Sequence, residues 1–135
     1  MKPRNIGIIG VGQTRYVARR DDATLPELAR EAALLALKDA GIEFKDVEGV
    51  VFSFALDALD GIEGAERCCA EAVGGCGKPF LRVHTGGATG GSAVHAGFFH
   101  IASGLFNSIL VVGAEKMGET PDAQNVLNQI FDPIY

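Results

Sequence analysis

Four short apolar runs divide the chain and alternate with stretches of a different pattern. They cover residues 6–12, 47–56, 79–84 and 108–113, and they are rich in Val, Ile, Leu and Phe. Short runs of this composition, bounded by glycine or polar residues, are typical of buried β-strands. We therefore predict four strands.

The stretch between the first two runs predicts an amphipathic helix. Thr24 and Glu27 have the spacing of a capping box, and Gly41 is placed to end the helix. Pro26 fits a first helical turn, where the missing amide has no partner to lose. Apolar residues then recur at the three- and four-residue intervals of one helix face. They are Leu25, Leu28, Ala32, Leu35 and Ala36.

Further helices are predicted between and after the remaining runs. A shorter helix is expected over residues 63–73, and another from about Ser92 to Ser103. Each is followed by glycine, which commonly ends a helix. A short helix is also expected around residues 123–130.

This alternation predicts the fold class. Strands that alternate with helices need crossover connections, which give a parallel sheet with helices on its faces. We expect an α/β fold with a mostly parallel sheet. Ligand sites in such sheets gather at the carboxyl ends of the strands, which here are residues 10–13, 57–61, 85–92 and 113–117.

Composition narrows the class of protein. Of the 135 residues, 47% are hydrophobic and 21% are charged, whereas a disordered chain has low hydrophobicity and high net charge. The net charge of −5 and the scattered basic residues argue against a nucleic-acid-binding protein. No apolar run reaches the ~18 residues of a membrane-spanning helix, so we expect no membrane span.

The cysteines indicate a reducing compartment. Cys68, Cys69 and Cys76 are odd in number, and no apolar signal segment opens the sequence. We therefore expect a cytoplasmic protein. The cysteine spacing fits no zinc motif, because no second pair of ligands follows, and we expect no metal site in this chain.

Gly10-Val11-Gly12 follows the first predicted strand, as in a dinucleotide-binding turn. That fingerprint has a third glycine where this chain has Arg15, and the next helix begins late, near Leu25. We interpret the segment as a tight turn at the end of a strand.

The stronger candidate is the glycine-rich segment Thr85–Ser92, which lies between a predicted strand and a predicted helix. Glycine lets the backbone approach a ligand closely, and a helix N-terminus presents amide donors and partial positive charge. These features suit a thioester carbonyl or a developing oxyanion. Close packing of the helix against a neighbouring element explains the glycines equally well. The sequence contains neither a phosphate-binding loop motif nor a Gly-x-Ser-x-Gly nucleophile elbow.

Other polar residues are weaker candidates. His84 ends the third strand beside the glycine-rich segment, where it is either an acid–base group or an ordinary polar histidine. His95 and His100 are five residues apart and diverge on a helix, so they form no metal pair. Glu115-Lys116-Met117 lies at a strand end, where a local ion pair is the simplest interpretation.

Two long segments resemble the thiolase superfamily. They are Val-His-Thr-Gly-Gly-Ala-Thr-Gly-Gly-Ser-Ala-Val-His-Ala from Val83, and Ile-Leu-Val-Val-Gly-Ala-Glu-Lys-Met from Ile109. The nearest branch is similar to sterol-carrier-protein-type thiolases and their lipid-transfer-protein relatives. The opening residues 8–15 fit the same branch, so the resemblance covers nearly the whole chain.

The resemblance implies a thiolase-like fold of αβαβα layers built from two similar halves. Residues 1–135 would be the N-terminal part of the thiolase N-terminal domain. That half-domain would be incomplete, and the second half would be absent. The resemblance also implies a homodimer that pairs through the third strand.

For function, the resemblance implies a thiolase-like acyl-CoA enzyme, similar to acetyl-CoA acetyltransferase, that makes or cleaves a carbon–carbon bond next to a CoA thioester. Gly87 stands where the family has its nucleophilic cysteine, so an ordinary covalent acyl-enzyme is in doubt. One alternative is a retro-aldolase that acts on 3-hydroxyacyl-CoA with a small OB-fold partner carrying a zinc ribbon. Another is a catalytically silent subunit that binds acyl-CoA or lipid.

The expected site follows from the same resemblance. The substrate would be a coenzyme A thioester, with no covalently bound cofactor, and the isolated 135-residue piece would be inactive. The catalytic residues are unidentified, with His84 as a candidate. The expected substrate-binding residues are Thr85, Gly86, Gly87, Ala88, Thr89 and Gly90.

Overall fold

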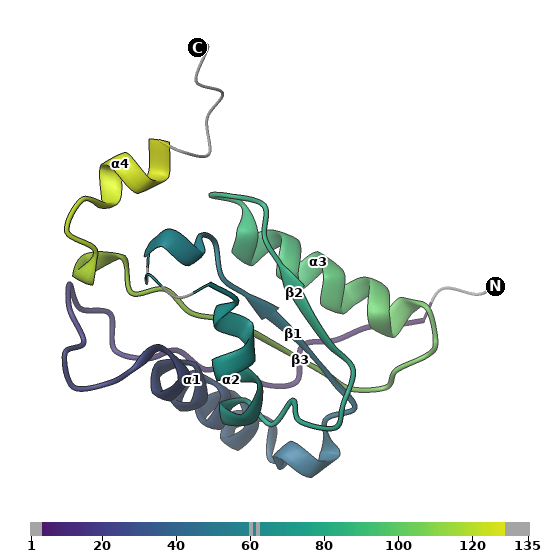
Figure 1. Cartoon of the computed structure of the whole chain (residues 1–135). Coiled ribbons are helices and arrows are strands. Elements are labelled where there is room, and N and C mark those ends of the chain that lie inside the picture. The colour runs from purple at the N-terminus through teal and green to yellow at the C-terminus, as the bar shows by residue number, and fades with distance from the viewer. Residues whose placement is uncertain (1–3, 60, 62, 129–135) are drawn as a thin grey trace.

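Three parallel strands form the centre of the molecule. A computed structural model of the chain describes residues 4–59, 61 and 63–128. Strands β1 (Gly49–Ser53), β2 (Phe80–Val83) and β3 (Ile109–Gly113) pair in the order β2-β1-β3 (Figure 1). Both pairings of β1 are parallel. The predicted α/β class with a parallel sheet is therefore confirmed.

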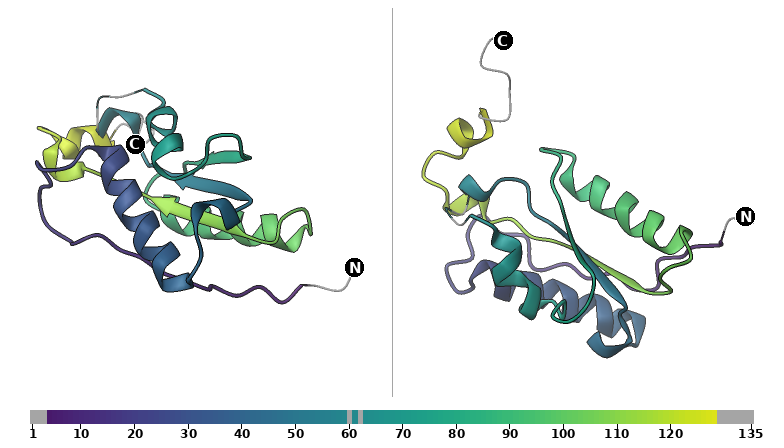
Figure 2. Two further views of the ribbon diagram at one scale, coloured as in Figure 1. Left: turned by 90° about the horizontal axis from the view of Figure 1, so that it is seen from below. Right: turned by 45° about the vertical axis from the view of Figure 1, so that its right-hand side comes forward.

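Helices cover both faces of this sheet (Figures 1 and 2). Helices α1 (Leu25–Ala40) and α2 (Ala65–Ala72) lie together on one face, and α3 (Thr89–Ala102) covers the other. Helix α4 (Ala123–Asn128) lies at the end of the described chain. Three short 3-10 helices were not predicted, namely Phe44–Asp46 (η1), Asp57–Leu59 (η2) and Met117–Glu119 (η3).

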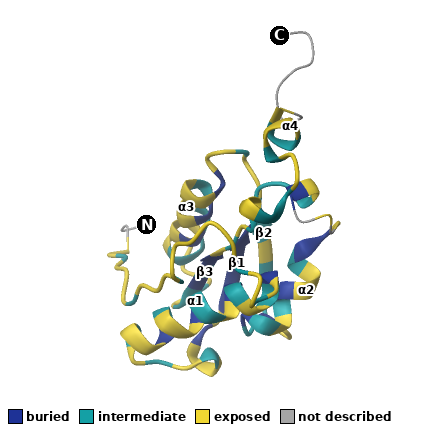
Figure 3. Cartoon of the chain, turned by 90° about the vertical axis from the view of Figure 1, so that its left-hand side faces the viewer, coloured by how far each residue is buried: buried dark blue, intermediate teal, exposed yellow. Residues whose placement is uncertain are grey.

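The main hydrophobic core lies between the sheet and the α1–α2 layer, as Figure 3 shows by burial. Val50, Phe52 and Phe54 point into it, and every residue of β1 is buried. Alternate residues of the same strand, such as Val51, face α3. Because both faces of the parallel sheet are covered, β1 and β3 are largely apolar, which explains their continuous runs in the sequence.

The signals for the two ends of the predicted helix hold in α1, but the predicted apolar face is wrong beyond Leu25. The buried residues of α1 are Leu25, Ala29, Ala33 and Leu37. Thr24 Oγ1 accepts a hydrogen bond from the Glu27 amide at 3.4 Å, and a Glu27 carboxylate oxygen accepts the Thr24 amide at 2.8 Å. Gly41 ends the helix with φ +69°, in the left-handed region that favours glycine. The capping box and the C-terminal glycine are both confirmed.

The predicted first strand, residues 6–12, is wrong as an element of this sheet. The segment runs as extended chain outside the sheet, and Ile8, Ile9 and Val11 have 80%, 67% and 68% of their surfaces exposed. Its backbone lies against α1, because a Cβ added at Gly12 would be 2.3 Å from the Ala36 amide nitrogen. An apolar run forms a strand only where another strand lies beside it and provides backbone hydrogen bonds.

The start of α3 also differs from the prediction. Helix α3 begins at Thr89 rather than near Ser92, so half of the expected turn is helical. The reason is that Thr89 itself closes the turn through its hydroxyl group. Helix α4 agrees with the short C-terminal helix, although residues 129–130 lie outside the described part of the chain. No described helix is both long and apolar enough to cross a membrane.

A charged cluster ties β2 to the loop that follows β1. The Arg82 guanidinium lies 2.6 Å from the carboxylate of Asp57 and 2.8 Å from that of Glu66. Asp57 also accepts the Gly64 amide at 3.1 Å. The hydrogen bond from Arg82 lowers the pKa of Asp57 below its ordinary value. The cluster fixes the connection between β1 and α2.

We expect the Asp57→Asn variant to lose less stability in acid than the unchanged chain does. Because the pKa of Asp57 is lowered in the folded chain, its carboxylate stabilises the fold above the unfolded pKa. That stabilisation is lost as the pH falls through the folded pKa. The free energy of unfolding, measured with urea between about pH 5 and pH 2, should fall less steeply in the variant.

Arg82→Gln is the matched control, since it removes the cation that lowers the pKa. In this variant too, the free energy of unfolding should fall less steeply between about pH 5 and pH 2. An Asp57→Asn protein with the full acid dependence of the unchanged chain would contradict the assignment.

Candidate functional site

The carboxyl ends of the three strands meet at one edge of the sheet. In the register, Ser53 of β1 lies beside Val83 of β2 and Gly113 of β3. A cavity of about 360 Å³ opens at this edge. Its lining comes from the three strand ends, the start of α3 and α4: Ser53, Ala55, Leu56, Gly86, Gly87, Thr89, Gly90, Gly113, Ala114, Glu115, Met117 and Leu127.

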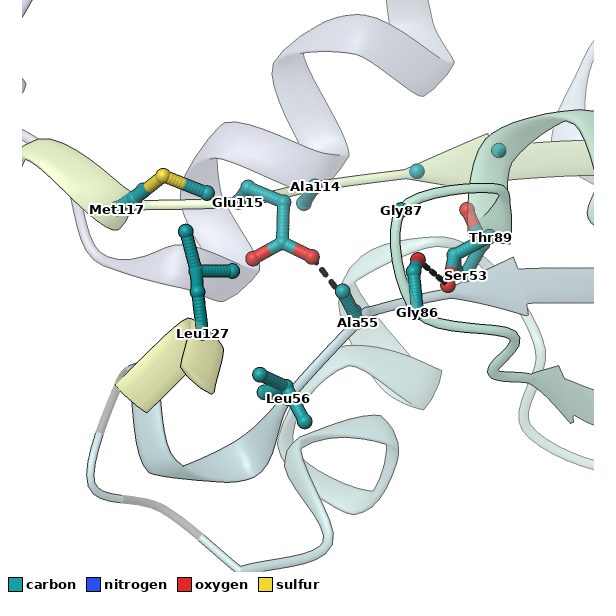
Figure 4. Close-up of a pocket in the computed structure, with 12 residues that line it drawn as sticks. Ser53, Ala55, Leu56, Gly86, Gly87, Thr89, Ala114, Glu115, Met117 and Leu127 are labelled. Atoms are coloured by element: carbon teal, nitrogen blue, oxygen red, sulfur yellow. Dashed lines mark hydrogen bonds between the residues drawn. The ribbon is translucent and has the colours of Figure 1, made fainter. Parts of the chain in front are cut away.

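Hydroxyl groups hold the turn after β2 in one shape. Thr89 Oγ1 accepts the Thr85 amide at 3.0 Å. It also donates to the Gly86 carbonyl at 2.6 Å (Figure 4). Gly86 has φ +61°, a conformation that a residue with a Cβ rarely adopts. Thr89 is 6% exposed, so its hydroxyl lies largely out of the solvent's reach. The turn is therefore a fixed wall of the cavity.

The N-terminus of α3 opens at the same wall. Gly90 and Gly91 occupy the first turn of the helix, where backbone amides have no partner within the helix. Ala88 at the N-cap position provides no side-chain hydrogen bond, and the first turn contains no acidic residue. These amides and the partial positive charge of the helix terminus suit an anionic or strongly polarised oxygen.

Gly87 leaves the turn without a nucleophile but with space for one. A Cβ added at Gly87 would meet no heavy atom within 4 Å, and its φ is not in the left-handed region. Cys68 and Cys76 are exposed on and after α2, and none of the three cysteines lines the cavity. The cavity lining therefore contains no thiol.

The opposite wall comes from the segment after β3. A carboxylate oxygen of Glu115 accepts the Ala55 amide at 2.5 Å, which ties the ends of β3 and β1 together. Lys116 turns away from the cavity and lies 2.7 Å from the Glu119 carboxylate. The hydrogen bond from Lys116 lowers the pKa of Glu119. The local ion pair expected here thus joins Lys116 to Glu119, and Glu115 faces the cavity.

The expected site residues are only partly brought together. Gly86, Gly87, Thr89 and Gly90 line the cavity, whereas Thr85 and Ala88 lie outside its lining. His84 is exposed and also lies outside the lining.

Sequence reasoning missed the residues on the other walls, chiefly Ser53, Glu115, Met117 and Leu127. Glu115 and Met117 lie within a strand end that the pattern did mark. Within the described residues, no group of three or more His, Cys, Asp or Glu side chains could hold a metal ion.

Most of the chain is similar to known proteins. A family model for the thiolase N-terminal domain matches residues 6–131. The chain is 31% identical over 130 residues to an acetyl-CoA acetyltransferase of Methanocaldococcus jannaschii, covering 96% of this chain and 33% of that protein. It is 32% identical over 124 residues to sterol carrier protein 2 of Bos taurus, covering 88% of this chain and 22% of that protein. The chain spans a third or less of the length of these relatives.

Solved structures give the same fold. The structure of an Ltp2-ChsH2(DUF35) aldolase matches with a TM-score of 0.57 and 30% identity, covering 77% of this chain and 26% of that one. The 3-oxoacyl-[acyl-carrier-protein] synthase III of Aquifex aeolicus VF5 matches with a TM-score of 0.62 and 21% identity, covering 75% of this chain and 33% of that one. The predicted thiolase-like fold is confirmed.

We expect Thr89→Val to destabilise the protein by about 1–3 kcal/mol, because it removes two part-buried hydrogen bonds of the turn, one from the Thr85 amide and one to the Gly86 carbonyl. Ser92→Ala is the matched control. It removes the more exposed hydroxyl contact between Thr85 and Ser92 and should cost less than about 0.5 kcal/mol. Urea unfolding of both variants measures the difference, and equal costs would contradict a structural role for the Thr89 hydroxyl.

Proposed function

This chain belongs to the thiolase family through its N-terminal domain, and we propose that the intact protein binds a CoA thioester and makes or breaks a carbon–carbon bond beside it. We propose further that it does so without a covalent acyl-enzyme. One observation carries this proposal. The cavity is lined by Gly86 and Gly87 of the turn and by Gly90 in the first turn of α3, and its lining contains no nucleophilic cysteine.

The cavity suits an acyl thioester in two respects. Amide donors at the start of α3 match the carbonyl oxygen of the thioester, which gains negative charge when the adjacent carbon becomes an enolate. Apolar side chains, mainly Leu56, Met117 and Leu127, line the part of the cavity away from the turn. They provide a surface for an acyl chain.

Cleavage of a 3-hydroxyacyl-CoA by a retro-aldol reaction fits this site better than thiolysis does. Thiolysis through an acyl-enzyme needs a nucleophile that accepts the acyl group, and Gly87 cannot supply one. A retro-aldol reaction needs only a base and a stabiliser for the enolate oxygen. The likeness to an aldolase structure at 30% identity supports this choice. Acetyltransferase chemistry, as in the relatives of that name, would require a nucleophile from elsewhere.

The reaction requires more than this chain provides. Because the chain spans a third or less of its relatives, we propose that further catalytic groups come from a second half and that the 135-residue chain alone is inactive. A small OB-fold partner with a zinc ribbon is the proposed companion, since the aldolase that this chain resembles is named for Ltp2 together with ChsH2(DUF35).

Association between copies is a further part of the proposal. Strand β2 lies at the edge of the described sheet, so its outer side can pair with β2 of a second copy. Light scattering that showed only single copies would contradict this. The exposed thiols of Cys68 and Cys76 fit the reducing cytoplasm, which is the proposed location.

The proposed reaction is tested with the intact protein, a 3-hydroxyacyl-CoA, and separately a 3-ketoacyl-CoA with free CoA. We expect the 3-hydroxy substrate to be cleaved to a carbonyl compound and a shorter acyl-CoA, with no acyl adduct on the protein by mass spectrometry. Thiolysis of the 3-ketoacyl-CoA would instead favour the acyltransferase. Binding without turnover would leave a silent acyl-CoA-binding subunit, and absence of binding would refute the proposal.

We expect Gly87→Cys to create an acyl acceptor. The position has space for the side chain, and a thiol at a helix N-terminus has a lowered pKa and is more reactive. The thiolate would attack the thioester carbonyl and release CoA, adding the mass of one acyl group. Gly7→Cys, also at an exposed glycine with open space, controls for adventitious acylation. Equal labelling of the two variants would contradict the placement of Gly87 beside the thioester.

A further inference from the structure

We propose that Glu115 is the general base that removes the proton from the 3-hydroxyl group of the substrate. This inference rests on the proposed function and identifies the base that the retro-aldol reaction needs. It follows from the position of Glu115 in the cavity, its contact with β1, and the chemistry of the residues around it.

Glu115 lies between the two parts of the cavity. Figure 4 shows its carboxylate pointing inward, with Gly86 and Gly87 to one side and Met117 and Leu127 to the other. In the proposed pose the thioester carbonyl lies at the glycine turn and the acyl chain points toward the apolar side chains. The 3-hydroxyl group of the substrate then lies next to Glu115. In this pose the Glu115 carboxylate lies on the C3 side of the C2–C3 bond that breaks, and the backbone amides lie on the thioester side.

No other side chain in this lining can act as the base. Of the described residues that line the cavity, Glu115 is the only one with an ionisable side chain. Asp57 is bound to Arg82 on β2, and Tyr16 is 93% exposed and also lies outside the lining. Within this lining Glu115 therefore carries the one carboxylate that can act as the base.

The surrounding backbone holds Glu115 in position. The Ala55 amide donates to its carboxylate. The next residue, Lys116, donates to the Ala23 carbonyl at 2.5 Å and pairs with Glu119, which in turn accepts the Arg20 amide at 3.2 Å. These contacts anchor the segment after β3 on another loop, so the carboxylate is oriented before a substrate arrives.

The step balances without a redox partner. The Glu115 carboxylate takes the proton of the 3-hydroxyl, whose O–H electron pair forms the C=O bond of the departing carbonyl compound. The C2–C3 bond breaks, and its electron pair moves onto C2 and the thioester oxygen, where the amides at the glycine turn stabilise the enolate. The proton then returns from the Glu115 carboxylic acid to C2, giving the shortened acyl-CoA and the carboxylate.

Glu115→Gln separates this role from a structural one. Glutamine keeps a carbonyl oxygen that can accept the Ala55 amide, but it is not a base at neutral pH. We expect kcat for retro-aldol cleavage by the intact protein to fall about 100-fold or more. The KM and the midpoint of thermal unfolding should change little. Glu71→Gln is the matched control, because Glu71 lies on α2 away from the cavity, and it should retain full activity.

Chemical rescue adds a second measurement. Glu115→Ala leaves space for a small carboxylate, so added formate should restore part of its cleavage rate and should not accelerate Glu71→Gln. If the unchanged protein cleaves the substrate and Glu115→Gln cleaves it at the same rate, Glu115 is not the base, while the proposed function survives. If the unchanged protein does not cleave the substrate, the proposed function and this inference fail together.

Discussion

The parallel pairing of β1 with both of its neighbours is the constraint on which the rest of the structure depends. It brings three strand exits, from Ser53, Val83 and Gly113, to the same edge of the sheet. The approach there is close, since a Cβ at Gly113 would lie 2.7 Å from Ser53 Oγ. Each exit then supplies one wall of the cavity. Residues that are 60 positions apart in sequence, such as Ala55 and Glu115, become hydrogen-bonded neighbours.

Much of this fold could be predicted from the sequence because its signals are local. The capping box at Thr24, the stop at Gly41 and the apolar runs of the three paired strands depend on nearby residues and on burial alone. Residues 6–12 show the limit of that reasoning. Their apolar pattern is strand-like, yet pairing requires another strand alongside, and periodicity does not report that. Gly10 and Gly12 instead serve a close approach to α1.

The candidate site was predictable only on the wall that carries a sequence motif. The glycine-rich turn can be recognised in the sequence, because a positive φ and close backbone approach restrict which residues are allowed there. Glu115 follows a strand like many surface carboxylates, and its neighbour Lys116 offers an obvious local partner. Only the tertiary structure shows that Lys116 binds Glu119 and the Ala23 carbonyl. Which of two adjacent charges faces a cavity depends on these distant anchors.

The cavity lining contains a carboxylate and no thiol. Both features favour a reaction without a covalent acyl-enzyme. A covalent route divides its task between a nucleophile and a base, and this cavity lining contains a carboxylate but no thiol. Cleavage of a 3-hydroxyacyl thioester never transfers the acyl group to the protein, so this reaction needs no thiol in the cavity lining. Its demands are a proton acceptor near C3 and donors to the thioester oxygen, which together account for large rate factors in other enzymes. Amides at the start of α3 and the carboxylate on the opposite wall match those two demands.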